Sequence, residues 1–353
     1  MRPISAADAV SAAVQRTRDL LFRPFRWGTY LKLGLVAIVT EGLGSNLPSS
    51  SNSGSSPSGH VPTNLAPFNV PGAQIAAAVA MLLLVGVIAL FIFYLITRLR
   101  FAYFHCLIHN TTEIGPGWTI YQPQALRFFW MNVAVGFGFL LAMVAIALPF
   151  IGGFIRLFHE SRQTHHLDVQ LMLSLVLPLI PIIFVLAVAG VMTDVVLRDW
   201  MLPHYALEDA SAGEAWSAVW ARVTAEKKQF LVYTVLRLIL PFLAAIALFF
   251  VLMIPGLVLA ASVAVAEWGI HSIFADSTGA SAVVGVLLQV FFGVLAFVFA
   301  LLAGICVGGP VSTSIREYAL VFYGGHYRAL GDILYPSAPP YTAPTFGSGQ
   351  LSY

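Results

Sequence analysis

The stretch IAAAVAMLLLVGVIALFIFYLI, residues 75–96, decides the class of fold. It contains no charged residue, and an apolar run of about 20 residues is long enough to cross the hydrocarbon core of a bilayer as a helix. The chain as a whole has the same character, because 59% of its residues are hydrophobic and only 10% are charged, against roughly 25% charged residues in soluble domains. The sequence therefore predicts an all-α, polytopic membrane helix bundle.

Further apolar runs predict six transmembrane helices within one integral membrane domain, residues 1–330. The predicted spans are about 29–44, 74–97, 131–155, 171–195, 232–264 and 282–307. Residues 45–71, rich in Ser, Gly, Asn and Pro, are typical of a flexible exoplasmic loop. The Pro- and Tyr-rich residues 331–353 are typical of a disordered cytoplasmic tail.

The distribution of cations supports the first and weakest of these spans. With six spans and both termini in the cytoplasm, only Arg156 and Arg162 of the 18 Lys and Arg residues fall outside the cell. Cytoplasmic flanks of membrane proteins accumulate Lys and Arg, whereas omission of the first span would export every cation that precedes Glu41. The excess of Arg over Lys favours a GC-rich bacterial genome. We therefore expect a bacterial inner membrane protein with both termini inside.

Two decamers, SAADAVSAAV at residues 5–14 and SAGEAWSAVW at residues 211–220, resemble each other. Each begins with Ser and carries an acid three residues later, which is the spacing of a helix-starting capping box. We expect amphipathic interfacial helices at about 5–24 and 211–228, each feeding a span. Their predicted membrane-facing stripes are Val10, Val14, Thr17 and Leu21, and Trp216, Trp220, Val223 and Lys227. The alternative is that juxtamembrane sequences converge on Ala, Arg and Trp.

The second, fourth and sixth spans also end alike. The exits RLRFAYFHCLIHN (98–110), LRDWMLPHYALED (197–209) and IREYALVFYGGHY (315–327) each contain Arg, aromatic residues and His. Together with the decamers, these exits indicate an internal repeat of three helical hairpins, each in the same orientation.

These motifs resemble a known family. LFRPFRWGTYLKLGLVAIVTEGL (21–43), the polar loop after it and the SAGEAWSAVWARV entry (211–223) look like an uncharacterised family of six-span bacterial membrane proteins. That family is similar to the membrane domain fused to some glycerophosphodiester phosphodiesterases. The resemblance extends to about Gly325 and implies a membrane module of unknown role. It transfers no catalytic residue, because the soluble phosphodiesterase domain is not present in this sequence.

Charged residues within or beside the spans form the candidate intramembrane polar site, because an ionisable group in hydrocarbon is costly. They are Lys32, Glu41, Asp194, Arg198 and Arg237. Asp194 and Arg198 are four residues apart, which predicts a helical ion pair. Lys32 and Arg237 are expected to extend their side chains to the inner interface. Glu41 is expected to be wetted at the outer end of its span, with a proton- or cation-binding role left open.

Metal and catalytic motifs are missing from the sequence. RLFHESRQTHHLD (156–168) contains metal-ligand residue types at His159, Glu160, His165, His166 and Asp168. However, His159-Glu160 is not followed by a second His at the spacing that a zinc helix needs. We predict no metal, no cofactor and no enzyme activity. We predict no nucleic-acid partner, because the net charge is only +2 and the cations lie beside the spans.

The sequence thus favours a non-catalytic membrane module that organises or assembles with envelope proteins or lipids. Its expected partners are the lipid bilayer and a membrane protein, which includes a second copy of the chain. The alternative is a transporter or lipid-translocating protein that uses the intramembrane charges, since repeats and proline-broken spans are common in transporters. An enzyme acting on lipid headgroups is a third hypothesis.

Overall fold

The computed structural model describes residues 5–45, 72–164, 169–274 and 280–336, and these residues form helices joined by short turns. The helices are α1 (Asp8–Phe22), α2 (Trp27–Ser45), α3 (Gly72–His109), α4 (Ile114–Ile120), α5 (Gln122–Thr164), α6 (Val169–Val195), the π-helical segment η1 (Val196–Met201), α7 (Leu202–Leu207), α8 (Ala212–Ala225), α9 (Lys227–Phe274), α10 (Ala280–His326) and α11 (Arg328–Leu334). The described part is all-helical, as predicted. The predicted loop 45–71 lies outside the described residues except for Ser45, and the tail prediction began too early, because α11 continues to Leu334.

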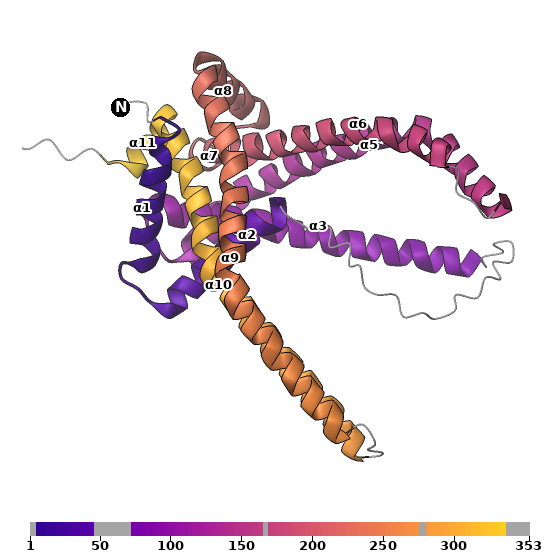
Figure 1. The fold of residues 1–353 in the computed structure, drawn as a ribbon. Coiled ribbons are helices and arrows are strands. Elements are labelled where there is room, and N and C mark those ends of the chain that lie inside the picture. Colours follow the sequence, from indigo (N-terminus) through magenta and orange to yellow (C-terminus); the bar gives the residue numbers. More distant parts are fainter. Residues whose placement is uncertain (1–4, 46–71, 165–168, 275–279, 337–353) are drawn as a thin grey trace, which may run out of the picture.

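The helices form a head from which three arms extend (Figure 1). One arm is α3 alone, the second is α5 beside α6, and the third is α9 beside α10. We define the arms as residues 72–97, residues 132–164 with 169–193, and residues 238–274 with 280–307. The remaining described residues make up the head.

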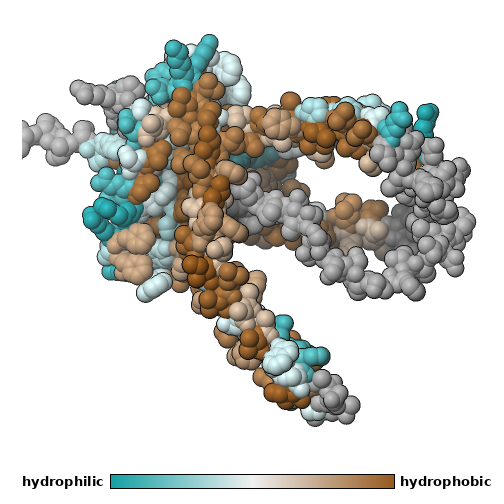
Figure 2. Space-filling view, in the orientation of Figure 1, coloured by the Kyte–Doolittle hydropathy of each residue, from teal (hydrophilic) through white to brown (hydrophobic). Residues whose placement is uncertain are grey.

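The arms carry the apolar surface of the molecule. Five helices are long and apolar enough to cross a membrane: Ala76–His109, Gln122–Leu157, Met172–Leu207, Lys227–Phe274 and Val283–His326. In the most apolar 18-residue stretch of each helix, the share of residues buried inside the structure is 0% for the first four helices and 6% for the fifth. Figure 2 shows this surface as hydrophobic side chains along the arms. The five helices are compatible with a membrane protein, and their uncovered apolar surface suggests a membrane location for the arms.

The core of the chain lies in the head and is built largely from the three exit segments. Residues 101–104 of α3, 197–205 of η1 and α7, and 316–324 of α10 are buried. A helix segment that is buried on all sides belongs to the centre of a helical assembly. Aromatic rings fill the space between them: Tyr233 of α9 stacks on Tyr318 at 5.1 Å and on Phe322 at 4.3 Å between ring centroids.

Helix α2 differs from the predicted first span, because it is not among the five candidate spans. It also runs along α10 in the same direction. The hydroxyl of Tyr30 donates to the carbonyl of Cys306, Gly34 meets Gly309, and Glu41 faces Arg316 at 3.9 Å. In a six-span topology the first and sixth spans cross the membrane in opposite directions, so a first span beside α10 would run antiparallel to it. The end of α2 therefore lies beside the bases of the arms and not beside their tips.

The two decamers both lead into helices, but only the second starts its helix with the predicted capping box, because the N-cap residue of α1 is Ala7, without a side-chain cap. The Ser5 hydroxyl accepts a hydrogen bond from the Asp8 amide at 3.1 Å, and Ser211 forms a capping box with Glu214. The predicted faces are partly wrong. Ala9 and Ala13 of α1 are buried, as are the aligned Ala215 and Val219 of α8. Val14, Trp216 and Trp220 of the predicted stripes are about half exposed, while Thr17 and Leu21 are buried. Small alanine side chains allow α1 to pack closely on α10, and this contact selects the face.

Candidate functional site

Four of the five charged residues predicted as an intramembrane site meet at the bases of the arms. They come from different elements: Glu41 from α2, Asp194 from α6, Arg198 from η1 and Arg237 from α9. Lys32 does not join them, because it lies exposed on α2. The fold therefore brings together residues that are up to 196 positions apart in the sequence.

The predicted ion pair between Asp194 and Arg198 is present. Nη1 of Arg198 donates to Oδ2 of Asp194 at 2.9 Å. Nη2 of Arg198 lies 3.3 Å from Oε2 of Glu41 and donates to the carbonyl of Thr40 at 2.6 Å. The side chain of Arg198 is only 2% exposed, so it connects α6 to the end of α2 within the protein interior.

The sequence analysis missed Asp199, which is the carboxylate at the centre of the site. Its side chain is 0% exposed. Oδ2 accepts from Nε of Arg237 at 2.8 Å and from the hydroxyl of Tyr233 at 2.8 Å, and Oδ1 accepts from Nη1 of Arg316 at 3.0 Å. A signal for it was present in the sequence, because Asp199 is an acid that directly follows Arg198 at the end of the fourth apolar run. A carboxylate enclosed in this way needs its cations.

Two of the expectations for single residues were wrong. Glu41 is not wetted: its side chain is 9% exposed and lies 3.3 Å from Arg237 and 3.3 Å from Arg198. Arg237 does not extend to the interface either, since its side chain is 11% exposed and points to Asp199 and Glu41. The reason in both cases is the direction of α2, which brings Glu41 to the level of the arm bases.

The similarity of the three exits in sequence corresponds to a convergence in space. Their arginines, Arg100, Arg198 and Arg316, all approach the end of α2. Arg100 Nε donates to the carbonyl of Thr40 at 3.2 Å, as Arg198 does, and Arg316 donates to the carbonyl of Arg198 at 2.9 Å. Thr40 lies five residues before the last residue of α2, Ser45, so its carbonyl lies near the negative end of the helix dipole but precedes the last four carbonyls, which lack partners within the helix. The guanidinium groups give this carbonyl additional hydrogen bonds and place positive charge beside it.

We call these residues the ionic cluster: Glu41, Asp194 and Asp199 with Arg100, Arg198, Arg237 and Arg316. Its four cations face three carboxylates and the carbonyl end of α2. Asp194 is its most exposed carboxylate, at 36% of the side chain. The geometry disfavours a bound cation at Glu41, because guanidinium groups surround this carboxylate and would repel one. What the cluster does is hold the bases of all three arms to α2.

A second polar group joins the second exit to the third. Nδ1 of His204 lies 2.8 Å from Oε2 of Glu208, and Nε2 lies 2.8 Å from the hydroxyl of Tyr323. Burial acts to raise the pKa of Glu208, but the hydrogen bonds with His204 and Tyr327 and the positive charges of His204 and Arg222 together outweigh it and lower this pKa below its usual range. The His204 side chain is 0% exposed and the Glu208 side chain is 47% exposed, so the buried imidazole connects Tyr323 in the interior to a carboxylate at the surface of the head.

The histidines do not assemble a metal centre in the part of the chain that the structure describes. No group of three His, Cys, Asp or Glu side chains there could hold a metal ion. His159 lies near the end of α5, where its ring faces the carbonyl of Ile155. The other candidates from that segment, His165, His166 and Asp168, lie outside the described residues, and so does the Glu160 side chain.

A family model for a family of unknown function, DUF7544, matches residues 4–333. The chain belongs to the DUF7544 family. The match includes all three arms and the ionic cluster, so both are part of the DUF7544 unit. No curated protein and no solved structure matches the chain. Since the DUF7544 description states no activity, the functional argument rests on geometry.

Proposed function

We propose that the protein is a non-catalytic membrane module that assembles with other membrane helices through its arms. One observation carries the proposal: the apolar windows of the five candidate spans are almost entirely uncovered by the chain itself. Helices that stay in a bilayer associate through close packing of their side chains. The arms leave such surface available, for example at Leu141, Phe249 and Val290, which are 53%, 65% and 57% exposed.

The ionic cluster supports a non-catalytic role. Its arginines and carboxylates are paired with each other or with the end of α2, and four of its side chains are less than 10% exposed: Glu41, Arg198, Asp199 and Arg316. Catalytic groups must reach a substrate, whereas these groups reach one another. The cluster fits a structural role, in which it fixes the arms to the head while their apolar surfaces meet other components.

We place the head on the cytoplasmic side of a bacterial inner membrane, with both termini inside. The concentration of cations in and beside the head supports this placement. Both termini on one side of a membrane require an even number of crossings, and six crossings remain our proposal. The repeated decamers support three repeat units in this arrangement.

Photocrosslinking in native membranes tests the assembly. A photoreactive amino acid is placed at Leu141, Phe249 or Val290, one position in α5, one in α9 and one in α10. We expect discrete protein adducts from at least one arm, and two differently tagged copies show whether the partner is the same chain. The matched control is Thr119, an exposed residue of the head, which should not give the same adduct. Lipid adducts alone from all three arm positions would contradict the proposal.

The alternative function is transport or lipid translocation. The specific observation in its favour is that prolines interrupt the arms, at Pro149, Pro178, Pro181, Pro241 and Pro255, because such breaks can act as kinks. A proteoliposome flux assay with native lipids and ions separates the two functions. If the protein is a non-catalytic module, vesicles that contain it should show the same flux as vesicles without protein. Flux above that level, removed by Asp194→Asn or Glu41→Gln, would establish the alternative.

A further inference from the structure

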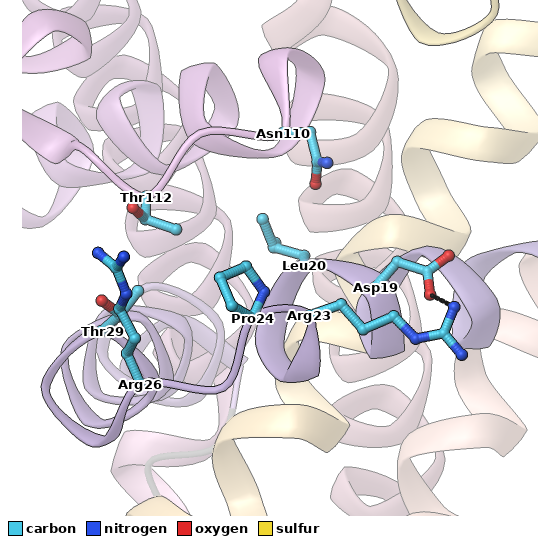
Figure 3. A pocket seen from close by; sticks show the side chains of 8 residues that line it. All are labelled: Asp19, Leu20, Arg23, Pro24, Arg26, Thr29, Asn110 and Thr112. Carbon is cyan, nitrogen blue, oxygen red and sulfur yellow. Dashed lines mark ion pairs between the residues drawn. The ribbon is translucent and has the colours of Figure 1, made fainter.

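Three adjoining pockets lie at the corner of the head where α1 meets α2 and where α3 ends. The first has a volume of about 200 Å³ and lies between the 23–29 turn and residues Asn110 and Thr112 (Figure 3). The second, about 330 Å³, extends past Asn110 to His105. The third, about 390 Å³, extends past Asn110 towards Arg16. Because Asn110 lines all three, the pockets are neighbours along this edge of the head, and we call the three together the groove.

The first pocket contains hydrogen-bond donors that the protein does not use. In Figure 3 the guanidinium of Arg26 points towards Thr112, the Asn110 amide points into the same space, and Leu20 and Pro24 lie between them. Arg23 points away to Asp19, at 3.4 Å. Within the described residues, the side chains of Arg26, Asn110 and Thr112 make no hydrogen bond or ion pair. The pocket therefore offers a guanidinium, an amide and a hydroxyl to a ligand.

The charge at this corner favours an anion. Residues 16–32 contain five cations and a single acid, Asp19. Arg16 is paired with Glu317 at 2.9 Å, and Arg23 is paired with Asp19. Arg18, Arg26 and Lys32 have no ion pair in the part of the chain that the structure describes. Arginine is well suited to phosphate, because its planar donors match the phosphate oxygens. Glu113, in the second pocket, is the other acid of the groove.

Exposed aromatic rings adjoin these cations. Phe22, Phe25 and Trp27 are 44%, 44% and 64% exposed. They contact one another, with ring centroids 6.1 Å apart for Phe22 and Phe25 and 5.1 Å apart for Phe25 and Trp27. Exposed aromatic side chains beside Arg are typical of the membrane–water interface. We call these three residues the aromatic corner.

The depth of the corner agrees with that interface. Tyr30, one turn into α2, donates its hydroxyl hydrogen bond to the carbonyl of Cys306. Cys306 lies at the end of the apolar run of α10, residues 282–307. The corner is thus level with the place where the third arm leaves the head, which in a bilayer is the depth of lipid headgroups.

We propose that the groove binds the phosphate of an anionic membrane lipid. Arg26, Asn110 and Thr112 donate hydrogen bonds to the phosphate oxygens, and the aromatic corner contacts the upper part of the acyl chains. Lys32, which has no ion pair among the described residues, adds a positive field that favours a net negative headgroup over a zwitterionic one. This inference rests on the membrane location in the proposed function and not on the assembly of the arms with other helices.

The test measures lipid retention by the full detergent-purified chain with native mass spectrometry. The probes are phosphatidylglycerol and phosphatidylcholine with identical acyl chains. We expect half-saturation with phosphatidylglycerol at about tenfold lower concentration than with phosphatidylcholine, since one charge-assisted contact is worth roughly that factor. R26Q should weaken retention of phosphatidylglycerol about tenfold, and R26K should weaken it less. R18Q, which removes an exposed cation outside the groove, is the control and should change it less than twofold.

Four outcomes would overturn the proposal. The first is that the unaltered chain shows no preference for phosphatidylglycerol, and the second is that R26Q retains this lipid as well as the unaltered chain does. The third is an equal loss of retention in R18Q and R26Q. The fourth is complete displacement of the lipid by inorganic phosphate, which would show a phosphate site without lipid specificity. W27A should weaken retention of both lipids to a similar extent. Arm adducts from photocrosslinking, measured in R26Q, report on the proposed assembly separately. If the arm adducts persist in R26Q while its preference for phosphatidylglycerol is lost, the loss of lipid binding is due to the groove and not to a failure of the arms to assemble.

Discussion

At the scale of single residues, Asp199 is the position on which the head depends most. It is fully enclosed and receives Arg237, Arg316 and Tyr233. Removal of one partner from a buried ion network costs more than the net contribution of the pair, because an uncompensated charge remains in the interior. Here two arginines would lose their common carboxylate, and the bases of two helices, α9 and α10, would repel each other.

Asp199→Asn should therefore lower the free energy of unfolding by about 3 kcal/mol or more. The measurement is unfolding of the full chain by a denaturing detergent in mixed micelles, followed by circular dichroism. Asp332→Asn is the matched control, because Asp332 and Arg328 form a surface pair with side chains 57% and 92% exposed. An effect of the same size in both variants would show that the enclosed position of Asp199 is irrelevant.

At the scale of elements, α2 owes its position to glycine as well as to charge. A Cβ atom on Gly309 of α10 would lie 2.6 Å from the Cα of Gly34, and real Cβ contacts are longer than that. The two backbones cross at these glycines. The crossing fixes the path of α2, so that Glu41, two turns after Gly34, lies among Arg198, Arg237 and Arg316. Small residues at a helix crossing allow the close approach that membrane helices use.

Gly309→Ala should separate α2 from α10 and lower the free energy of unfolding by about 1–3 kcal/mol. Thermal unfolding in detergent, with the fluorescence of the seven tryptophans as the signal, measures the change. Gly304→Ala is the control on the same helix, because a Cβ there meets nothing within 4 Å. It should be neutral or slightly stabilising, since Ala favours helix over Gly. Equal destabilisation by both would attribute the effect to α10 itself and not to the crossing.

The elements were the most predictable part of this protein. Each long apolar helix falls where an apolar run predicted it, and Ser211 begins α8 as predicted because a capping box depends on residues only three positions apart. The same prediction was wrong at Ser5, since α1 begins at Asp8 without a side-chain cap. The choice of buried face was less predictable. Ala9 and Ala13 of α1 are buried against α10, although their neighbour Val14 is more apolar, because the fit between two surfaces decides which side faces inward.

At the scale of the whole molecule, the head and the arms separate the polar from the apolar parts of the chain. The ion pairs and the aromatic core are in the head, and the arms expose their apolar side chains. With the cations at the head, this division predicts that the head stays in the cytoplasm and that the tips of the arms reach the other side.

Cysteine labelling of intact cells with a membrane-impermeant maleimide measures this orientation. Ser272→Cys, at the tip of the third arm, should be labelled, and Thr119→Cys, exposed on the head, should be labelled only after the cells are lysed. The unaltered chain is the background, because Cys106 is buried and Cys306 is partly buried. Labelling of Thr119→Cys but not of Ser272→Cys in intact cells would reverse the orientation.

The sequence by itself determined the class of this protein, the long helices and the start of α8. These are local properties: the length of an apolar run decides whether a helix can cross a bilayer, and a cap involves residues within one turn. The tertiary structure alone decided the direction of α2, the enclosure of Glu41 and the central place of Asp199. Glu41 meets Arg198, Arg237 and Arg316 only because four helices converge. Charges that attract across more than 150 positions leave no mark in local sequence, since their energy depends on distance in space.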